Sequence, residues 1–228
     1  MKTAYFWLTP QGKQLAEQLQ AHFGGTVEPK ADFAEAVRRA FADCDALVFV
    51  MATGIVVRTI APLVQSKASD PAVLVLDQRG KHVISLLSGH LGGANAMAEQ
   101  TAAYLGGEAV ITTATDVEHV PAFDLFAKEN HLTIENLEEL KYISGALVAG
   151  EPVSLCTAFP VEKNAFPETV QIQPFSETPR HACAVAIADT TESVAAPHVL
   201  YLRPKSLVLG VGWGFGCLAL PICCGWAG

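Results

Sequence analysis

The sequence predicts an α/β fold, in which a layered domain with a mostly parallel sheet is followed by a smaller α+β domain. Short apolar runs alternate with stretches of helical periodicity over residues 1–118, as in folds that wrap helices around a sheet. The run 46–52 has no polar alternation, which is typical of a strand buried on both faces. After residue 118 proline recurs and the predicted elements become short. We therefore expect domains over 1–118 and 119–205, with a separate segment at 206–228.

Local signals justify the elements of the first domain. Its first helix begins at Thr9-Pro10, where threonine can cap and proline suits the first turn. Thr53 is expected to cap a later helix, which Pro62 must bend or break. A turn containing Gly80 is expected to join two strands into a hairpin. In chain order the expected elements are strand 3–9, helix 10–22, helix 33–44, strand 46–52, helix 54–65, strands 72–77 and 82–88, a helix ending at 105, and strand 109–114.

The second domain has shorter elements separated by prolines. Its helices are expected first and its strands afterwards, an order that favours an α+β arrangement. The expected elements are helices 123–131 and 137–149, then strands 153–157, 170–172, 182–188 and 199–202.

Composition and charge exclude several classes of protein. Half of the 228 residues are hydrophobic and 17% are charged, as in an ordinary globular protein. The formal net charge of -8 gives no basic surface to neutralise phosphates, so no nucleic-acid partner is expected. The N-terminus reads as a strand and lacks the regions of a signal peptide, and the six cysteines show no metal-ligand spacing. We expect a cytoplasmic protein with reduced cysteines.

Segment 206–228 carries no charge, and its length alone would allow a membrane span. It also holds several glycines and a proline, and it begins as a strand that runs into a glycine turn. We expect the start of a further domain and no membrane contact. The alternative is that this segment tethers the protein to a membrane. No metal site is expected here, because the adjacent cysteines Cys223 and Cys224 have poor geometry for binding one ion.

The strongest chemical signal is the glycine-rich segment 88–95, which follows a predicted strand and opens a helix. Glycines let backbone N–H groups approach a ligand, and a helix start favours an anion. The same glycines also suit a turn that packs a helix tightly on the sheet, and the sequence leaves both readings open. His90 within this segment is a candidate base or anion donor.

Two further segments follow predicted strands. Asp116 ends the strand that begins at 109, where open α/β sheets place ligands. Thr53 and Gly54 form a small-residue turn, and Arg58 is a charge within the apolar helix that follows. Arg58 needs either a ligand or an acidic neighbour such as Asp70. Together the three segments predict one carboxylate-binding cleft.

Four motifs in order resemble the cobalamin biosynthesis protein G family, the cobalt-precorrin-5A hydrolases. They are the segments 53–63, 67–73, 86–95 and 110–116, and similarity continues at 124–128 and 134–136. The resemblance extends to about residue 212. That family continues into a sizeable C-terminal domain, so 206–228 is expected to be its truncated start or an unrelated tail.

The resemblance implies an enzyme that opens the δ-lactone of cobalt-precorrin-5A with water and releases acetaldehyde, giving cobalt-precorrin-5B. Cobalt belongs to this substrate, so no protein cofactor or metal site is expected, and other enzymes of the pathway are candidate partners. His90 is the expected base, Asp116 orients it or replaces it, and Gly92 and Gly93 offer oxyanion donors. The expected substrate-binding residues are Thr53, Gly54, Arg58, Lys67, Ser88, Gly89, Gly92, Gly93, Asn95, Thr113 and Thr115.

A non-catalytic protein is the alternative reading. In that case the glycine-rich segment would hold an anion of a tetrapyrrole or nucleotide, and no bond would be broken. Release of acetaldehyde from cobalt-precorrin-5A separates the two readings.

Overall fold

The computed structural model describes residues 1–67, 69–162 and 165–205, and the chain divides into two compact units, Met1–Thr113 and Ala114–Gly228. The division falls shortly before the boundary expected after residue 118. The expectations for 206–228, including a membrane tether, lie outside the described residues. Within the described part of the chain, no helix has the length and apolar character needed to cross a membrane.

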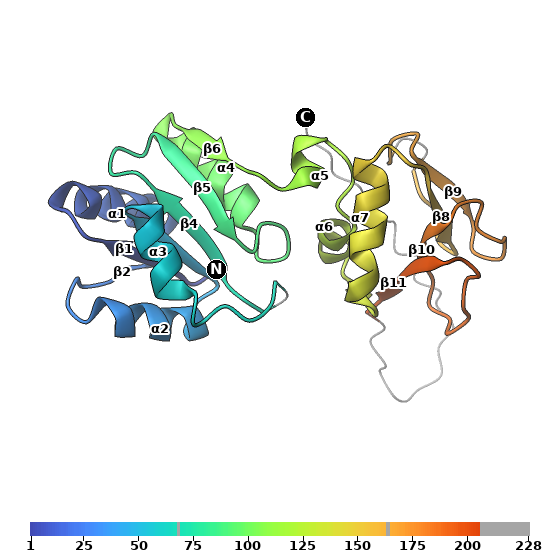
Figure 1. The fold of residues 1–228 in the computed structure, drawn as a ribbon, viewed down its shortest axis with the longest axis horizontal. Helices are drawn as coiled ribbons and strands as arrows, with labels where there is room; N and C mark the ends of the chain where they lie inside the picture. The colour runs from blue at the N-terminus through green and yellow to red at the C-terminus, as the bar shows by residue number, and fades with distance from the viewer. Residues whose placement is uncertain (68, 163–164, 206–228) are drawn as a thin grey trace, which may run out of the picture. The chain divides into compact units, whose positions relative to one another are not determined.

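The first unit is built on a six-stranded sheet with the order β2-β1-β3-β4-β5-β6 (Figure 1). The predicted alternation of strands and helices is confirmed, and the α/β fold class with it. Two elements were not predicted. One is β2, which has only two residues, and the other is the helix α5 (Ala114–Val117), which begins where the predicted strand 109–114 was expected to end. The elements are β1 (Thr3–Trp7), α1 (Pro10–Phe23), β2 (Thr26–Val27), α2 (Phe33–Asp43), β3 (Ala46–Val50), α3 (Thr53–Ile60), β4 (Ala72–Leu76), β5 (His82–Leu87), α4 (Ala94–Leu105) and β6 (Glu108–Val110).

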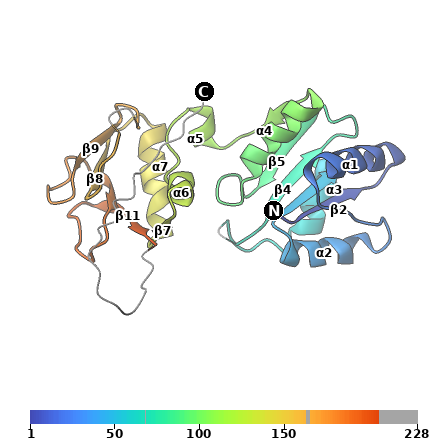
Figure 2. The same ribbon diagram turned by 180° about the vertical axis from the view of Figure 1, so that it is seen from behind.

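Helices cover both faces of this sheet because side chains alternate along each strand. In β3, Val48 faces the layer formed by α1 and α4, whereas Leu47 and Phe49 face α2 and α3. Figure 1 shows α3 and α2 on the near face of the sheet, and Figure 2 shows α1 and α4 on the other. This burial on both sides explains the continuous apolar run that marked β3 in the sequence.

Strand direction defines two opposite edges of the first sheet. Strands β1, β3 and β4 are parallel, and we call the edge where they end the carboxyl edge and the edge where they begin the amino edge. β5 is antiparallel to β4, so it begins at the carboxyl edge and ends at the amino edge. Ala72 and Leu76, the ends of β4, lie about 13 Å apart at a rise of about 3.3 Å per residue.

The second unit has a five-stranded sheet with the order β7-β11-β10-β8-β9. Its strands are parallel except for the edge strand β7, and α6 and α7 cover one face. The helices on a single face fit the expected α+β arrangement, but the mostly parallel sheet does not, and β7 was not predicted. The elements are α5 (Ala114–Val117), α6 (Phe123–Glu129), β7 (Leu132–Ile134), a 3-10 helix at Leu137–Glu139, α7 (Leu140–Val148), β8 (Val153–Thr157), β9 (Val170–Pro174), β10 (Cys183–Ile187) and β11 (His198–Pro204).

Candidate functional site

The carboxyl edge of the first unit holds a cavity of about 670 Å³. Residues at the ends of β1, β3 and β4 line it, together with the start of α3, the first half of β5 and Val110 of β6. Most of the lining side chains are apolar, and Thr53, Asp77, Gln78 and His82 are among the polar ones. Open α/β sheets commonly bind ligands beyond the carboxyl ends of their strands.

The start of α3 presents two backbone donors at this edge. Ala52 precedes the helix in an extended conformation and makes no side-chain cap, so the expectation that Thr53 caps the helix is wrong: Thr53 is its first helical residue. Among the described residues, the N–H groups of Thr53 and Gly54 donate to no other backbone group. Unpaired N–H groups at a helix start carry partial positive charge and can receive a carboxylate.

Arg58 lies one helical turn further along α3, and its guanidinium folds back toward the helix start. Two guanidinium nitrogens lie 3.6 Å from the position that a Cβ on Gly54 would take. The alternative of an ion pair with Asp70 is not realised, because the Asp70 carboxylate accepts from the N–H groups of Gln65 (2.9 Å) and Ser66 (3.0 Å). The structure thus places a cation beside two N–H donors, an arrangement suited to a carboxylate.

Asp77 and His82 form a pair at the rim of the same cavity. Asp77 Oδ2 lies 3.4 Å from His82 Nδ1, and the two residues stand at opposite ends of the β4–β5 turn. Burial acts to raise the pKa of Asp77, but hydrogen bonds from the N–H groups of His82 and Arg79 outweigh it and hold that pKa below its usual value. The carboxylate is therefore ionised at neutral pH. Neither residue was predicted as a site residue, although the predicted hairpin already placed them side by side.

The glycine-rich segment lies at the amino edge, because β5 runs antiparallel to β4. Ser88 Oγ donates to the carbonyl of Asp70 (2.9 Å), immediately before β4. The expected cleft between this segment and Thr53 is therefore contradicted: the two lie at opposite ends of β4. The prediction grouped the segments that follow β3 and β5, but β5 runs antiparallel to β4 and therefore ends at the edge opposite to the end of β3.

Three N–H groups of this segment donate to carbonyls of the same segment. Gly93 donates to the carbonyl of His90 (3.0 Å), Ala94 to that of Ser88 (3.1 Å) and Asn95 to that of Gly89 (3.0 Å). The oxyanion role expected of Gly93 does not hold, because its only N–H is already bonded. The N–H of Gly92 donates to no backbone group among the described residues. The reading in which glycines pack a helix tightly on the sheet accounts for most of this geometry.

Asn95 links α4 to two neighbouring segments. Its side chain is buried, accepts a hydrogen bond from Ser85 Oγ (2.6 Å) and donates to Thr113 Oγ1 (3.1 Å). Thr113 and Asn95, both expected site residues, are thus joined by a hydrogen bond. These bonds hold the start of α4 against β5 and the segment after β6.

The remaining expected residues belong to several segments of the two units. Lys67 is exposed in the loop before β4, and His90 is half-buried in the glycine-rich segment. Thr115 and Asp116 belong to α5 of the second unit. The strand expected to end at Asp116 stops at Val110, so the argument from a strand end is wrong for this carboxylate.

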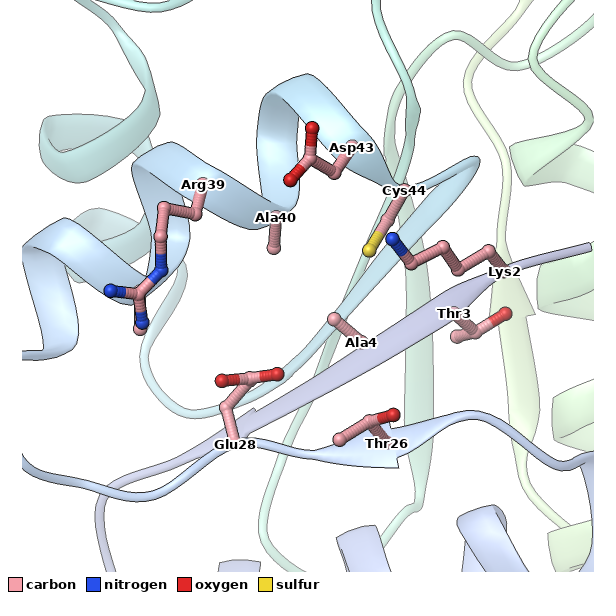
Figure 3. A pocket seen from close by; sticks show the side chains of 10 residues that line it. Lys2, Thr3, Ala4, Thr26, Glu28, Arg39, Ala40, Asp43 and Cys44 are labelled. Atoms are coloured by element: carbon pink, nitrogen blue, oxygen red, sulfur yellow. The ribbon is translucent and has the colours of Figure 1, made fainter.

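A smaller pocket of about 250 Å³ opens between the starts of β1 and β2 and the end of α2 (Figure 3). Lys2, Glu28, Arg39, Asp43 and Cys44 line it, and none of them was predicted as a site residue. Burial raises the pKa of the Cys44 thiol despite the nearby Lys2, so this sulfur is a protonated, weak nucleophile at neutral pH. Among the described residues, no group of three or more histidine, cysteine or acidic side chains could hold a metal ion.

Comparison with known proteins connects both units to one family. Residues 35–116 match the family model described as "Cobalamin synthesis G N-terminal", and residues 121–204 match "Cobalamin biosynthesis central region". A crystal structure of a cobalamin biosynthesis protein G homolog from Sulfolobus solfataricus is similar with a TM-score of 0.51 and 25% identity, over 89% of this chain and 60% of that one.

Two curated relatives are named cobalt-precorrin-5A hydrolase. The protein of Salmonella typhimurium is 44% identical over 165 residues, which are 67% of this chain and 47% of the relative. That of Priestia megaterium is 36% identical over 190 residues, or 77% and 50% of the two chains. The chain spans about half the length of these relatives. With the two family models matching in order, the chain belongs to the cobalamin synthesis G family, of which it carries the N-terminal and central regions.

Proposed function

We propose that this chain has the cobalt-precorrin-5A hydrolase activity after which its relatives are named. The reaction opens the δ-lactone of the substrate with water and releases acetaldehyde, and it leaves cobalt-precorrin-5B. The observation that supports this proposal is the start of α3: Thr53 lines a mostly apolar cavity, and the Arg58 guanidinium lies beside the next residue, Gly54.

The substrate fits that combination of surfaces. It is a macrocycle with apolar faces and an edge of acetate and propionate groups. A guanidinium and backbone N–H groups pair with such carboxylates, and apolar side chains accept the face of the ring. Cobalt enters as part of the substrate, and the reaction as proposed needs no resident cofactor. A cytoplasmic location is also proposed, supported by the free thiols of Cys44, Cys156 and Cys183.

The experiment is to incubate cobalt-precorrin-5A with the purified protein under anaerobic conditions and to measure acetaldehyde with an alcohol dehydrogenase assay. One equivalent of acetaldehyde per substrate is the expected result. Substrate binding without acetaldehyde would favour the non-catalytic tetrapyrrole-binding protein instead. The roles of His90 and Asp116 stay predictions, and His90→Ala and Asp116→Ala in the same assay test them.

Arg58→Ala is expected to raise the Kd for cobalt-precorrin-5A about 10-fold or more, because a charge-assisted hydrogen bond to a carboxylate is lost. An absorbance titration of the substrate measures this change. Arg38→Ala is the matched control: Arg38 is an exposed arginine of the same unit that pairs with Glu35, and its loss should leave the Kd unchanged. Equal Kd values for Arg58→Ala and the unsubstituted protein would remove Arg58 from the binding site.

A further inference from the structure

The cavity at the carboxyl edge contains a histidine and a carboxylate in mutual contact. His82 and Asp77 both line it, with 3.4 Å between His82 Nδ1 and Asp77 Oδ2. Thr53, at the start of α3, lines the same cavity. A histidine beside a carboxylate is a common proton-transfer unit, because the carboxylate fixes the orientation of the ring.

The backbone of the hairpin fixes Asp77. Its Oδ1 accepts from the N–H of Arg79 (2.8 Å) and its Oδ2 from the N–H of His82 (2.7 Å). The side chain therefore keeps one orientation while it contacts the imidazole. The ring of His82 is half-buried, so its other nitrogen can serve a ligand or a water molecule.

We propose that His82, oriented by Asp77, is the proton-transfer group for lactone opening in this cavity, an inference that rests on the proposed hydrolase function. Water attacks the lactone carbonyl while His82 takes one of its protons. The bond between the acyl carbon and the ring oxygen breaks, and the proton passes from His82 to that oxygen. The products are a carboxylic acid and an alcohol, with no change in oxidation state.

The location favours His82 over His90. The anion-receiving start of α3 and His82 belong to the carboxyl edge, whereas His90 lies in the segment at the amino edge. A substrate whose carboxylate binds at Thr53 and Gly54 has His82 within the same cavity.

Besides orienting His82, Asp77 stabilises the β4–β5 turn through its hydrogen bonds to the backbone. The decisive change is accordingly His82→Gln, which removes the imidazole and keeps the backbone N–H from which the Asp77 carboxylate accepts a hydrogen bond. His22→Gln is the matched control, because His22 is an exposed histidine of the same unit that stacks on Tyr104 and does not line the cavity.

His82→Gln is expected to lower the rate of acetaldehyde release about 10²- to 10⁴-fold with the Kd for cobalt-precorrin-5A changed less than about 3-fold. His22→Gln should match the unsubstituted protein. Asp77→Asn should slow the reaction in the parent protein and cause no further loss in the His82→Gln background, because it acts through the imidazole. Undiminished release by His82→Gln would overturn the assignment and leave the hydrolase function intact.

Chemical modification tests where the ligand binds, with a readout that does not depend on turnover. Diethyl pyrocarbonate modifies accessible histidines, and peptide mass spectrometry reports each of them. Cobalt-precorrin-5A is expected to protect His82 and to leave His22 and His90 modified. Protection of His90 alone, or of neither His82 nor His90, would overturn the inferred site. Absence of acetaldehyde with the parent protein would instead refute the proposed function, whatever the protection pattern.

Discussion

Gly92→Ala is expected to lower the free energy of unfolding of the first unit by about 3 kcal/mol, the upper part of the usual range for overpacking. A Cβ at this position would lie 2.5 Å from Ser88 Cβ, 2.7 Å from the Ser88 carbonyl oxygen and 3.3 Å from the backbone nitrogen of Ala72. Ser88 has little freedom to move away. Its φ of 57° is already in the left-handed region, its Oγ binds the Asp70 carbonyl and its carbonyl binds the N–H of Ala94.

Urea unfolding followed by hydrogen exchange of β4 peptides measures this loss. Gly54→Ala is the control, because a Cβ there meets only the Arg58 guanidinium at ordinary contact distance, 3.6 Å. Its unfolding free energy should change by less than about 1 kcal/mol, the usual difference between glycine and alanine in a helix. A Gly92→Ala protein of normal stability that no longer binds cobalt-precorrin-5A would restore the ligand-binding reading of the glycine-rich segment.

Phe49→Ala is expected to cost about 3–5 kcal/mol of unfolding free energy, because it removes a large side chain from the centre of the core. Phe49 is 0% exposed in the middle of the first sheet. Its ring stacks on Phe6 with 4.9 Å between centroids and meets the edge of Phe33 at 6.5 Å. The cavity left between β3 and α2 has no neighbouring side chain free to fill it without disturbing these contacts.

The same unfolding measurement compares Phe49→Ala with Phe23→Ala. Phe23 ends α1 and is 39% exposed, so its removal should cost less than about 1.5 kcal/mol. Similar losses for the two variants would contradict the central place of Phe49 in the core. The comparison holds the chemistry of the substitution constant and varies only burial.

Most helices and strands of the first unit were predictable because their signals are local. Thr9 accepts from the N–H of Gly12 at the start of α1, as the Thr-Pro pair predicts. α3 ends at Ile60, two residues before Pro62, since proline disfavours helix in the residue before it. The strands β2 and β7 were missed because two or three residues carry no periodicity and pair only through distant neighbours.

The candidate site was predicted only in part. Thr53, Gly54 and Arg58 were identified from a glycine turn and an unexplained charge; Thr53 lines the cavity and the Arg58 guanidinium lies beside Gly54, while their role in binding stays a prediction. His82 and Asp77 were not, because neither stands in a recognisable motif. Their contact arises from the pairing of β4 with β5, which brings the two ends of the turn together.

The glycine-rich segment shows where local reasoning ends. The sequence by itself determined that a strand runs into this segment and that a helix follows, and its motifs indicated the family. Only the tertiary structure decided that the segment lies at the amino edge, with the N–H groups of Gly93, Ala94 and Asn95 bonded within it, and that the cavity lies at the carboxyl edge. The physical reason is that residue periodicity records which side chains are buried, whereas the edge at which a strand ends depends on its direction among partners far away in the chain.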